Sequence, residues 1–178
     1  MADTIPKRLF DQAKSRGDAS AYLYKQHGVW KAVSWRHYGR EVTEAARALI
    51  ALGFEQGQRT CILGFNRPEW VLLDLATMAA GGAPAGIYTT CSPDEVQYIV
   101  SHSEAPLVLV ENEAQWQKIE KRRSELPLLK YVVFMRGTTP PPKPDGGPTL
   151  LSWDDFLARG ATTSEKEVFD RVDALEPS

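Results

Sequence analysis

Two glycine-rich stretches are the segments of this sequence whose composition could bind phosphate. The first is Gly81-Gly82-Ala83-Pro84-Ala85-Gly86, which follows a helical pattern. A phosphate loop normally leads from a strand into a helix, so that amide N–H groups and the positive helix end face the anion. At the C-terminal end of a helix, carbonyl groups and partial negative charge point outward instead. We therefore expect residues 81–86 to form a tight turn between a helix and a strand.

The second stretch is Arg136-Gly137-Thr138-Thr139-Pro140-Pro141-Pro142-Lys143. It is similar to the Ser-Gly-Thr-Thr-Gly-x-Pro-Lys-Gly loop that grips ATP in adenylate-forming enzymes. Pro140 stands where that loop has a glycine, and Pro144 replaces its final glycine. Proline lacks an N–H donor and fixes φ, whereas an anion-binding loop works through flexible backbone amides. We interpret this segment as an unrelated surface loop.

The histidines and cysteines form no catalytic or metal-binding pattern. His27, His37 and His102 lie far apart in the sequence, with no carboxylate or cysteine at the spacing of zinc ligands. Cys61 and Cys91 have no metal-type partner nearby, so we expect reduced thiols that are not bonded to each other. We expect no metal site and no catalytic residue among these 178 residues.

Composition and charge argue against several classes of partner. The chain is 43% hydrophobic and 25% charged, which is ordinary for a soluble globular protein. Its formal net charge of −2 provides no electrostatic basis for binding nucleic acid or an anionic membrane. The first seven residues lack the apolar core of a secretory signal, and no run approaches the roughly 20 apolar residues that cross a bilayer. We expect a cytoplasmic protein.

The elements that must position these groups alternate between strands and helices. Strands at residues 21–25 and 29–35, joined by His27-Gly28, predict an antiparallel hairpin. Apolar spacing predicts a helix from Val42 that ends before Gly53, and a helix over residues 67–80 with Asn66 as its N-cap. The second of these helices is apolar almost all round, which is typical of a helix covered on most sides.

Short apolar runs supply the remaining strands and predict the fold class. The expected strands are residues 60–65, 83–88, 107–110 and 131–135. A capping box at Ser92-Pro93-Asp94-Glu95 and an Asn112 cap start the helices between them, the second of which we expect to extend to residue 125. Strands alternating with helices predict an α/β fold with a parallel sheet of βαβ units, preceded by the antiparallel hairpin.

The expected organisation has three parts. Residues 1–35 form the hairpin region, residues 36–136 form the α/β sheet core, and residues 137–178 form a proline-rich loop with terminal helices. The proline-rich segment 138–148 is expected to be a loop or a hairpin tip, followed by helices near residues 153–157 and 165–175.

Several segments, in this order, resemble the opening of AMP-dependent acyl-CoA synthetases. The Asn-Arg-Pro-Glu-Trp and Tyr-Thr-Thr segments are most similar to the long-chain fatty-acid branch. The resemblance spans roughly residues 10–131, and it implies the N-terminal segment of a long-chain fatty-acyl-CoA synthetase whose ATP loop and C-terminal lid lie beyond residue 178. The segments are Ala48-Leu49-Ile50-Ala51-Leu52-Gly53-Phe54, Gly57-Gln58-Arg59-Thr60, Asn66-Arg67-Pro68-Glu69-Trp70, Ala79-Ala80-Gly81-Gly82-Ala83-Pro84, Tyr88-Thr89-Thr90 and Ser92-Pro93-Asp94-Glu95.

The resemblance also implies a reaction and a ligand-binding loop. In the family, a fatty carboxylate attacks the α-phosphate of Mg-ATP to give acyl-AMP and pyrophosphate, and the CoA thiol then displaces AMP. The whole ligase would therefore use ATP, Mg²⁺ and CoA, and this chain alone would be inactive. In relatives, the loop that matches residues 88–92 lies near the adenosine end of CoA. This places Tyr88, Thr89, Thr90 and Ser92 on the CoA side, with a plain strand-to-helix connection as the alternative.

Other functions and partners stay open at this stage. The chain could be a non-catalytic α/β interaction module, because a fold does not fix a function. It could also belong to an adenylate-forming ligase that acts on aryl or amino acids. The apolar helix at 67–80 predicts that the chain self-associates, and the whole ligase could contact a membrane peripherally.

Overall fold

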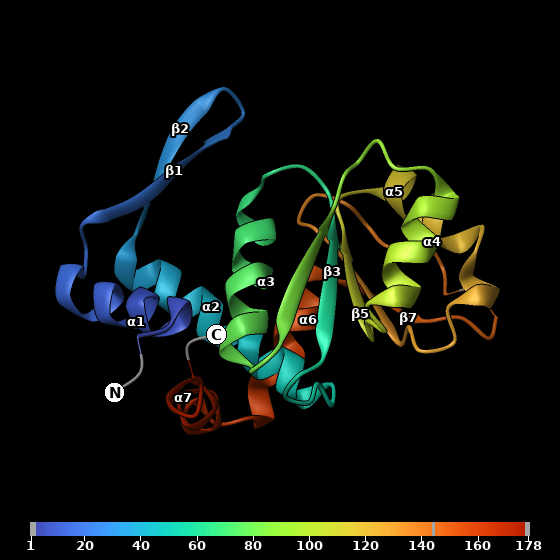
Figure 1. Ribbon diagram of the computed structural model, residues 1–178. Coiled ribbons are helices and arrows are strands. Elements are labelled where there is room, and N and C mark those ends of the chain that lie inside the picture. Colours follow the sequence, from blue (N-terminus) through green and yellow to red (C-terminus); the bar gives the residue numbers. More distant parts are fainter. Residues whose placement is uncertain (1–2, 144, 177–178) are drawn as a thin grey trace.

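Five parallel strands form the central sheet of the computed structural model, which describes residues 3–143 and 145–176 (Figure 1). Their spatial order is β4-β3-β5-β6-β7. In the ladder, Leu63 lies beside Ile87 on one side and Val110 on the other. The predicted parallel α/β sheet is confirmed. The strands are β3 (Arg59–Leu63), β4 (Ala83–Ile87), β5 (Leu107–Val110), β6 (Tyr131–Phe134) and β7 (Thr149–Ser152).

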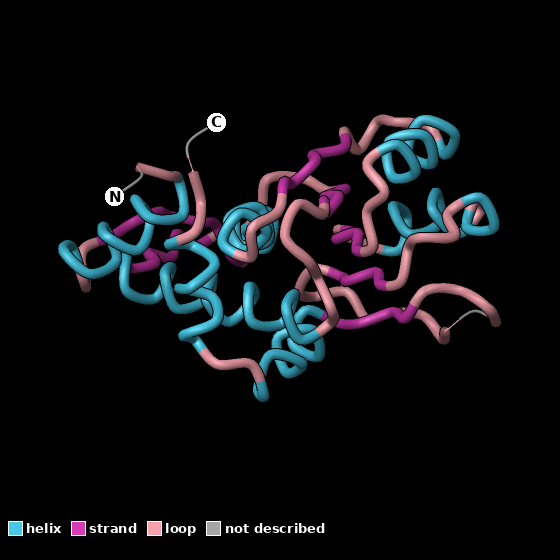
Figure 2. The backbone as a smooth tube through the Cα atoms, turned by 60° about the horizontal axis from the view of Figure 1, so that its bottom comes forward, coloured by secondary structure: helices cyan, strands magenta, loops and turns pink. Residues whose placement is uncertain are grey.

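Helices cover both faces of this sheet, as Figure 2 shows. Alternate residues of each strand face opposite sides, so Ile62 packs in one core and Cys61 and Leu63 in the other. The first face carries α2 (Trp35–Ala51), α3 (Pro68–Ala79) and α6 (Trp153–Arg159). The second face carries α4 (Pro93–His102), α5 (Glu113–Glu120) and the 3₁₀ turn η1 (Arg123–Glu125).

Two further helices lie outside the first face. They are α1 (Ile5–Arg16) and α7 (Glu165–Asp173), which follows a 3₁₀ turn η2 (Gly160–Thr162). Both pack on α2 and α3, and their aromatic rings meet where Phe10 and Phe169 pack edge to face with centroids 5.1 Å apart. Because of this second helical layer, α3 is covered within the chain, with Leu72, Leu73 and Ala76 fully buried. Self-association stays a prediction, but α3 no longer supplies the exposed surface on which it rested.

The predicted hairpin is confirmed and projects from the helices beside it (Figure 1). It consists of β1 (Ser20–Gln26) and β2 (Val29–Ser34). His27 and Gly28 both have positive φ, 49° and 81°, as in the primed turns whose twist matches that of paired strands. Tyr22 anchors the hairpin by packing edge to face on Tyr38 of α2, with ring centroids 5.1 Å apart.

Three helix boundaries differ from the prediction. Helix α3 has Arg67 rather than Asn66 as its N-cap, because Pro68 occupies the first helical position and needs no amide partner there. Helix α2 begins at Trp35, well before Val42, since the Ser34 hydroxyl accepts the backbone N–H of His37. Helix α5 ends at Glu120 and the chain continues as η1 rather than as α-helix to residue 125.

The proline-rich connection is not a hairpin tip. Strands β6 and β7 pair in parallel, so the chain must pass from the carboxyl end of β6 to the amino end of β7. Residues 135–148 make this crossing without a helix in their described part. The sequence pattern predicted no strand at β7, where Leu151 packs on the first face of the sheet.

Strand β4 is an open edge of the sheet and contains Pro84. The N–H of Ala83 donates to the Gln58 carbonyl at 3.0 Å, towards β3. Backbone groups alternate in direction along a strand, so position 84 faces the open side, where proline has no N–H to offer.

Candidate functional site

The loops at the carboxyl ends of the strands gather at one edge of the sheet, at the top in Figure 1. From β3 the chain moves to β4 on one side, and from β5 it moves to β6 on the other. This reversal is the topological switch point beside which open α/β sheets bind ligands. The loop after β3 is fixed there, because the N–H of Phe65 donates to Glu111 Oε2 at 3.0 Å.

A groove of about 660 Å³ opens at this edge between the loops that follow β3 and β4. Two aromatic side chains flank it, since Phe65 is 66% exposed and Tyr88 is 83% exposed. Its floor depends on Gly86, because a Cβ there would lie 3.2 Å from Cζ2 of Trp70. The lining residues are Gly64, Phe65, Asn66, Trp70, Gly86, Ile87, Tyr88 and Thr89.

The structure separates the four predicted site residues into two pairs. Tyr88 and Thr89 line the groove, whereas Thr90 and Ser92 do not. The Ser92 hydroxyl accepts the Glu95 backbone N–H at 3.3 Å, while the Ser92 N–H donates to Glu95 Oε2 at 2.7 Å. These bonds complete the predicted capping box, so the Ser92 hydroxyl acts at the start of α4.

Hydrogen bonds also hold the backbone of the Tyr88 loop. The N–H of Cys91 donates to the Tyr88 carbonyl at 3.0 Å, which closes a turn. From α5, Lys118 Nζ donates to the Thr89 carbonyl at 2.6 Å. The loop therefore presents an exposed ring and a threonine on a fixed backbone, with an ammonium group beside them.

A group of charged side chains at the same edge was not predicted from the sequence. We call Glu41, Arg67, Glu69 and Arg136 the Arg136 cluster. Arg136 Nη2 donates to Glu41 Oε1 at 3.0 Å, and its Nη1 lies 3.9 Å from Glu69 Oε1. Arg67 Nη2 donates to the Arg136 carbonyl at 2.7 Å, and its Nε lies 3.6 Å from Glu69 Oε2.

The carboxylates of this cluster are deeply placed. The side chain of Glu69 is 4% exposed and that of Glu41 is 11% exposed. Buried carboxylates need a counter-charge, and the two guanidinium groups supply it here. Glu69 Oε2 has no hydrogen-bond partner in the described structure and faces Arg67 only at ion-pair distance. The cluster ties the end of β6 to the starts of α2 and α3, which positions the loops of this edge.

Comparison with known proteins decides the family. The family model described as AMP-binding enzyme matches residues 9–152, most of the chain. This chain belongs to the AMP-binding enzyme family. It is 31% identical over 175 residues to the human long-chain-fatty-acid–CoA ligase ACSBG1, covering 98% of this chain and 24% of that protein. The chain thus spans about a quarter of the length of the curated relatives it matches.

Solved structures share the fold of this AMP-binding enzyme chain. Acetoacetyl-CoA synthetase from Streptomyces lividans superposes with a TM-score of 0.72 at 26% identity, over 86% of this chain and 24% of that one. The anthranilate CoA ligase AuaEII, in complex with anthranoyl-AMP, gives a TM-score of 0.73 at 22% identity, over 88% and 28%. The sequence resemblance to acyl-CoA synthetases is therefore confirmed.

Adenylate-forming ligases in general use ATP, Mg²⁺ and CoA. Among the described residues of this AMP-binding enzyme chain, no group of three or more His, Cys, Asp and Glu side chains could hold a metal ion. The groove is open beside Trp70, because Gly86 has no side chain there.

The two glycine-rich stretches have different outcomes. Gly81 has a φ of 87°, and a Cβ on Gly82 would lie 2.6 Å from the Gln58 carbonyl, so the predicted tight turn is confirmed. The second stretch starts at the edge of the sheet that carries the groove, where Thr138 Oγ1 donates to the Glu111 carbonyl at 3.1 Å. It then leaves this edge for the other end of the sheet, and residue 144 lies outside the described residues.

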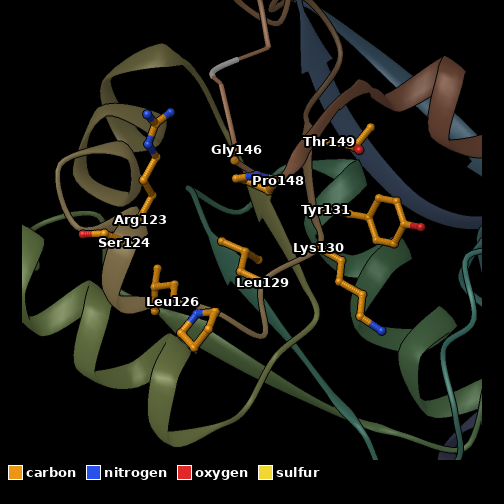
Figure 3. Close-up of a pocket in the computed structure, with 11 residues that line it drawn as sticks. Arg123, Ser124, Leu126, Leu129, Lys130, Tyr131, Gly146, Pro148 and Thr149 are labelled. Atoms are coloured by element: carbon orange, nitrogen blue, oxygen red, sulfur yellow. The ribbon is translucent and has the colours of Figure 1, made fainter.

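A second cavity, of about 450 Å³, lies at that other end (Figure 3). Residues from η1, from the start of β6 and from the loop before β7 surround it, including Arg123, Lys130 and Thr149. The amino ends of strands are not where open α/β sheets bind their ligands. We therefore assign the candidate site to the groove of about 660 Å³ that Tyr88 and Thr89 line.

Neither cysteine forms a disulfide in the described structure. Cys61 and Cys91 are both free, which confirms that they are not bonded to each other. Burial raises the pKa of the Cys61 thiol to about 11, although a hydrogen bond with Ser103 opposes the rise.

Among the described residues, no helix combines the length and apolarity that a membrane crossing requires.

Proposed function

We propose that this chain supplies the α/β scaffold and one wall of the CoA cleft in a long-chain fatty acid–CoA ligase. The supporting observation is the 31% identity to long-chain-fatty-acid–CoA ligases over 98% of the chain. The proposed overall reaction converts a fatty acid, ATP and CoA into acyl-CoA, AMP and pyrophosphate. A carboxylate oxygen first displaces pyrophosphate from the α-phosphorus, and the CoA sulfur then displaces AMP from the acyl carbon.

The residues of this chain bind and position ligands in that proposal. Tyr88 and Thr89 form the wall that contacts CoA, and Thr90 and Ser92 shape the loop that carries them. Trp70 and Gly86 set the depth of the groove. The Arg136 cluster holds the neighbouring loops in place. The groups that clamp the ATP phosphates and Mg²⁺ would come from other parts of the ligase.

A titration followed by NMR tests the CoA wall. We expect CoA to shift the backbone amides of residues 88–92, and ATP to leave them unchanged. Replacing Tyr88 by alanine should weaken the CoA shifts, while Tyr98→Ala is the matched control because Tyr98 is an exposed tyrosine on α4. The proposal for the loop fails if CoA causes no shifts there, or if ATP causes equal ones.

Exchange of labelled pyrophosphate into ATP tests the proposed reaction. We expect exchange that depends on fatty acid from the longest open reading frame containing this sequence, and none from the 178 residues alone. Exchange with aryl or amino acids only would assign the chain to another adenylate-forming ligase. No exchange with any acid would favour the non-catalytic interaction module.

A further inference from the structure

The outer face of the β1–β2 hairpin is an apolar surface without a partner among the described residues. We define the outer face as Leu23, Lys25, Trp30 and Ala32, which share one side because Leu23 lies opposite Ala32 and Lys25 opposite Trp30 in the ladder. Leu23 is 60% exposed and Trp30 is 64% exposed. The opposite side of the hairpin is occupied, since Val33 is buried and Tyr22 packs on Tyr38.

The hairpin is also positively charged, unlike the chain as a whole. Residues 19–40 contain no Asp or Glu, whereas the entire sequence has a net charge of −2. Lys25 and Lys31 form no ion pair with any described carboxylate. Lys25 Nζ instead lies 5.9 Å from the Trp30 ring centroid, so a cation and an indole share the outer face.

The shape of the hairpin makes this surface accessible. A tight turn at His27 and Gly28 closes it, and the exposed side chain of Val29 follows that turn. Figure 1 shows the hairpin extending beyond the helices towards the top, the side on which the loops at the carboxyl ends of the strands also lie. A flat surface approaching from that side would meet the hairpin tip.

We propose that the β1–β2 hairpin docks this protein on membrane surfaces that contain anionic lipids. Trp is enriched at the depth of lipid headgroups, where its ring is apolar and its N–H can meet water. Lysines near a membrane are attracted by the negative surface potential of anionic lipids. The outer face combines one Trp, one Leu and one Lys, and residues 19–40 contain no carboxylate to oppose binding. Lys31 projects from the opposite side of the hairpin, where it pairs with Tyr24 in the ladder and adds to the positive charge.

A second copy of this chain is a poorer occupant of the same face. Two outer faces placed together would bring the lysines of both hairpins into one interface. No carboxylate within residues 19–40 would neutralise them. Like charges brought together in this way oppose association.

Flotation with lipid vesicles tests the proposal on the 178-residue chain. We expect binding to vesicles of phosphatidylcholine mixed with phosphatidylserine, weaker binding at high salt, and little binding to phosphatidylcholine alone. Lys25→Gln with Lys31→Gln should lower the partition coefficient by about fivefold per lysine. Trp30→Ser should also lower it, without changing the circular dichroism spectrum.

Matched controls lie on the other side of the sheet or at its amino end. Tyr98→Ser removes an aromatic ring that is also 64% exposed, and Lys121→Gln with Lys130→Gln makes the same change in charge. These variants should bind as the parent does. The proposal is overturned if the folded parent does not bind the anionic vesicles, or if the hairpin and control variants bind equally.

Sedimentation velocity tests whether a second copy of the chain, instead of a membrane, occupies the outer face. A dimer that Trp30→Ser dissociates, with vesicle binding unchanged, would assign the outer face to a second copy and overturn membrane docking. The binding assay needs no ligase activity, so its failure leaves the proposed reaction untouched, and inactivity of the ligase leaves the membrane proposal untouched.

Discussion

The helices on one face of the sheet lie beneath a further pair of helices, whereas those on the other face border solvent. Helices α2 and α3 are enclosed between the sheet and the pair α1 and α7. Helices α4 and α5 have no such cover among the described residues, and Tyr98 of α4 is 64% exposed. The same sheet thus carries two helical layers on one side and one on the other.

This difference explains the composition of the helices. In α2, three alanines at positions 45, 46 and 48 are fully buried, because neighbouring helices approach from several directions. In α4 only Val96 and Val100 are buried, which suffices for one contact face. The apolar composition of a helix such as α3 therefore indicates that the helix is buried within the chain. It is not by itself evidence of an interface with another molecule. The enclosed side also contains the buried carboxylates of the Arg136 cluster.

The largest expected effect tests whether the single-layered side is as well packed as the other. Trp116 of α5 is fully buried against Phe134, so Trp116→Ala should lower the free energy of unfolding by about 4 kcal/mol. Phe169→Ala, in the outer helix α7 where the ring is 38% exposed, should cost much less. Urea denaturation measures both, and equal losses would contradict the assigned layers.

The second effect compares two arginines of similar exposure on opposite sides. The side chains of Arg136 and Arg122 are 39% and 40% exposed. Arg136 forms an ion pair with the buried Glu69, whereas Arg122 forms one with the exposed Asp94. Arg136→Met should lower the free energy of unfolding by about 3 kcal/mol, because it leaves buried carboxylates without their cation. Arg122→Met should cost less, as exposed ion pairs do.

A second substitution sharpens this prediction. Adding Glu69→Gln to Arg136→Met should recover part of the loss, since one uncompensated charge is removed. If the double variant is less stable than Arg136→Met alone, the cluster does not act through charge compensation.

A third prediction concerns two carboxyl groups with opposite pH dependence. Burial raises the pKa of Asp74 in α3, so its stabilising contribution is greatest at low pH and is lost as the pH rises through its folded pKa. Hydrogen bonds from Ser92 lower the pKa of Glu95 in α4, so its contribution is present above its unfolded pKa and is lost as the pH falls through its folded pKa. Asp74→Asn should therefore stabilise the protein at neutral pH, and Glu95→Gln should destabilise it there.

Thermal unfolding between acid and neutral pH checks both signs. The effect of each substitution should fade as the pH falls below the usual carboxyl range, because both carboxyl groups are then protonated in the folded and unfolded states. Equal pH profiles of unfolding temperature for the two variants would show that the environments of Asp74 and Glu95 do not shift their pKa values in opposite directions.

The smallest effect concerns thiol reactivity rather than stability. Cys91 is partly exposed at the Tyr88 loop, whereas Cys61 is buried and its raised pKa disfavours the reactive thiolate. A thiol reagent should modify Cys91 in the native protein and both cysteines after denaturation. Rapid modification of Cys61 in the native state would show that the β3–α4 contact opens easily.

Local patterns predicted the parts of the fold that one segment specifies by itself. The run Leu107–Val110 predicted a strand buried on both faces, and the Ser92 capping box predicted the start of α4. Strand β7 was missed because four residues, Thr-Leu-Leu-Ser, carry too short a pattern. Its place depends on pairing with β6, across a long connection that contains no helix in its described part.

The place of the candidate site was predictable only where it follows from sheet topology. The carboxyl end of β4 placed Tyr88 and Thr89 at the edge of the sheet that carries the groove, whereas Ser92 caps α4. The Arg136 cluster could not be inferred, because residues 41, 69 and 136 meet only after the sheet has formed. The available signal was the presence of two acidic residues, Glu69 and Asp74, in a mostly apolar helix.

Pro84 has a consequence for how concentrated solutions of this protein behave during refolding. A passing chain that extends a sheet needs a continuous row of donors and acceptors along the edge strand, and such strand addition begins many aggregates. On the open side of β4, position 84 supplies no donor, which leaves Gly86 as the next outward amide of a five-residue strand. A proline in the edge strand therefore protects this margin of the sheet against fibril growth by edge-to-edge addition of strands.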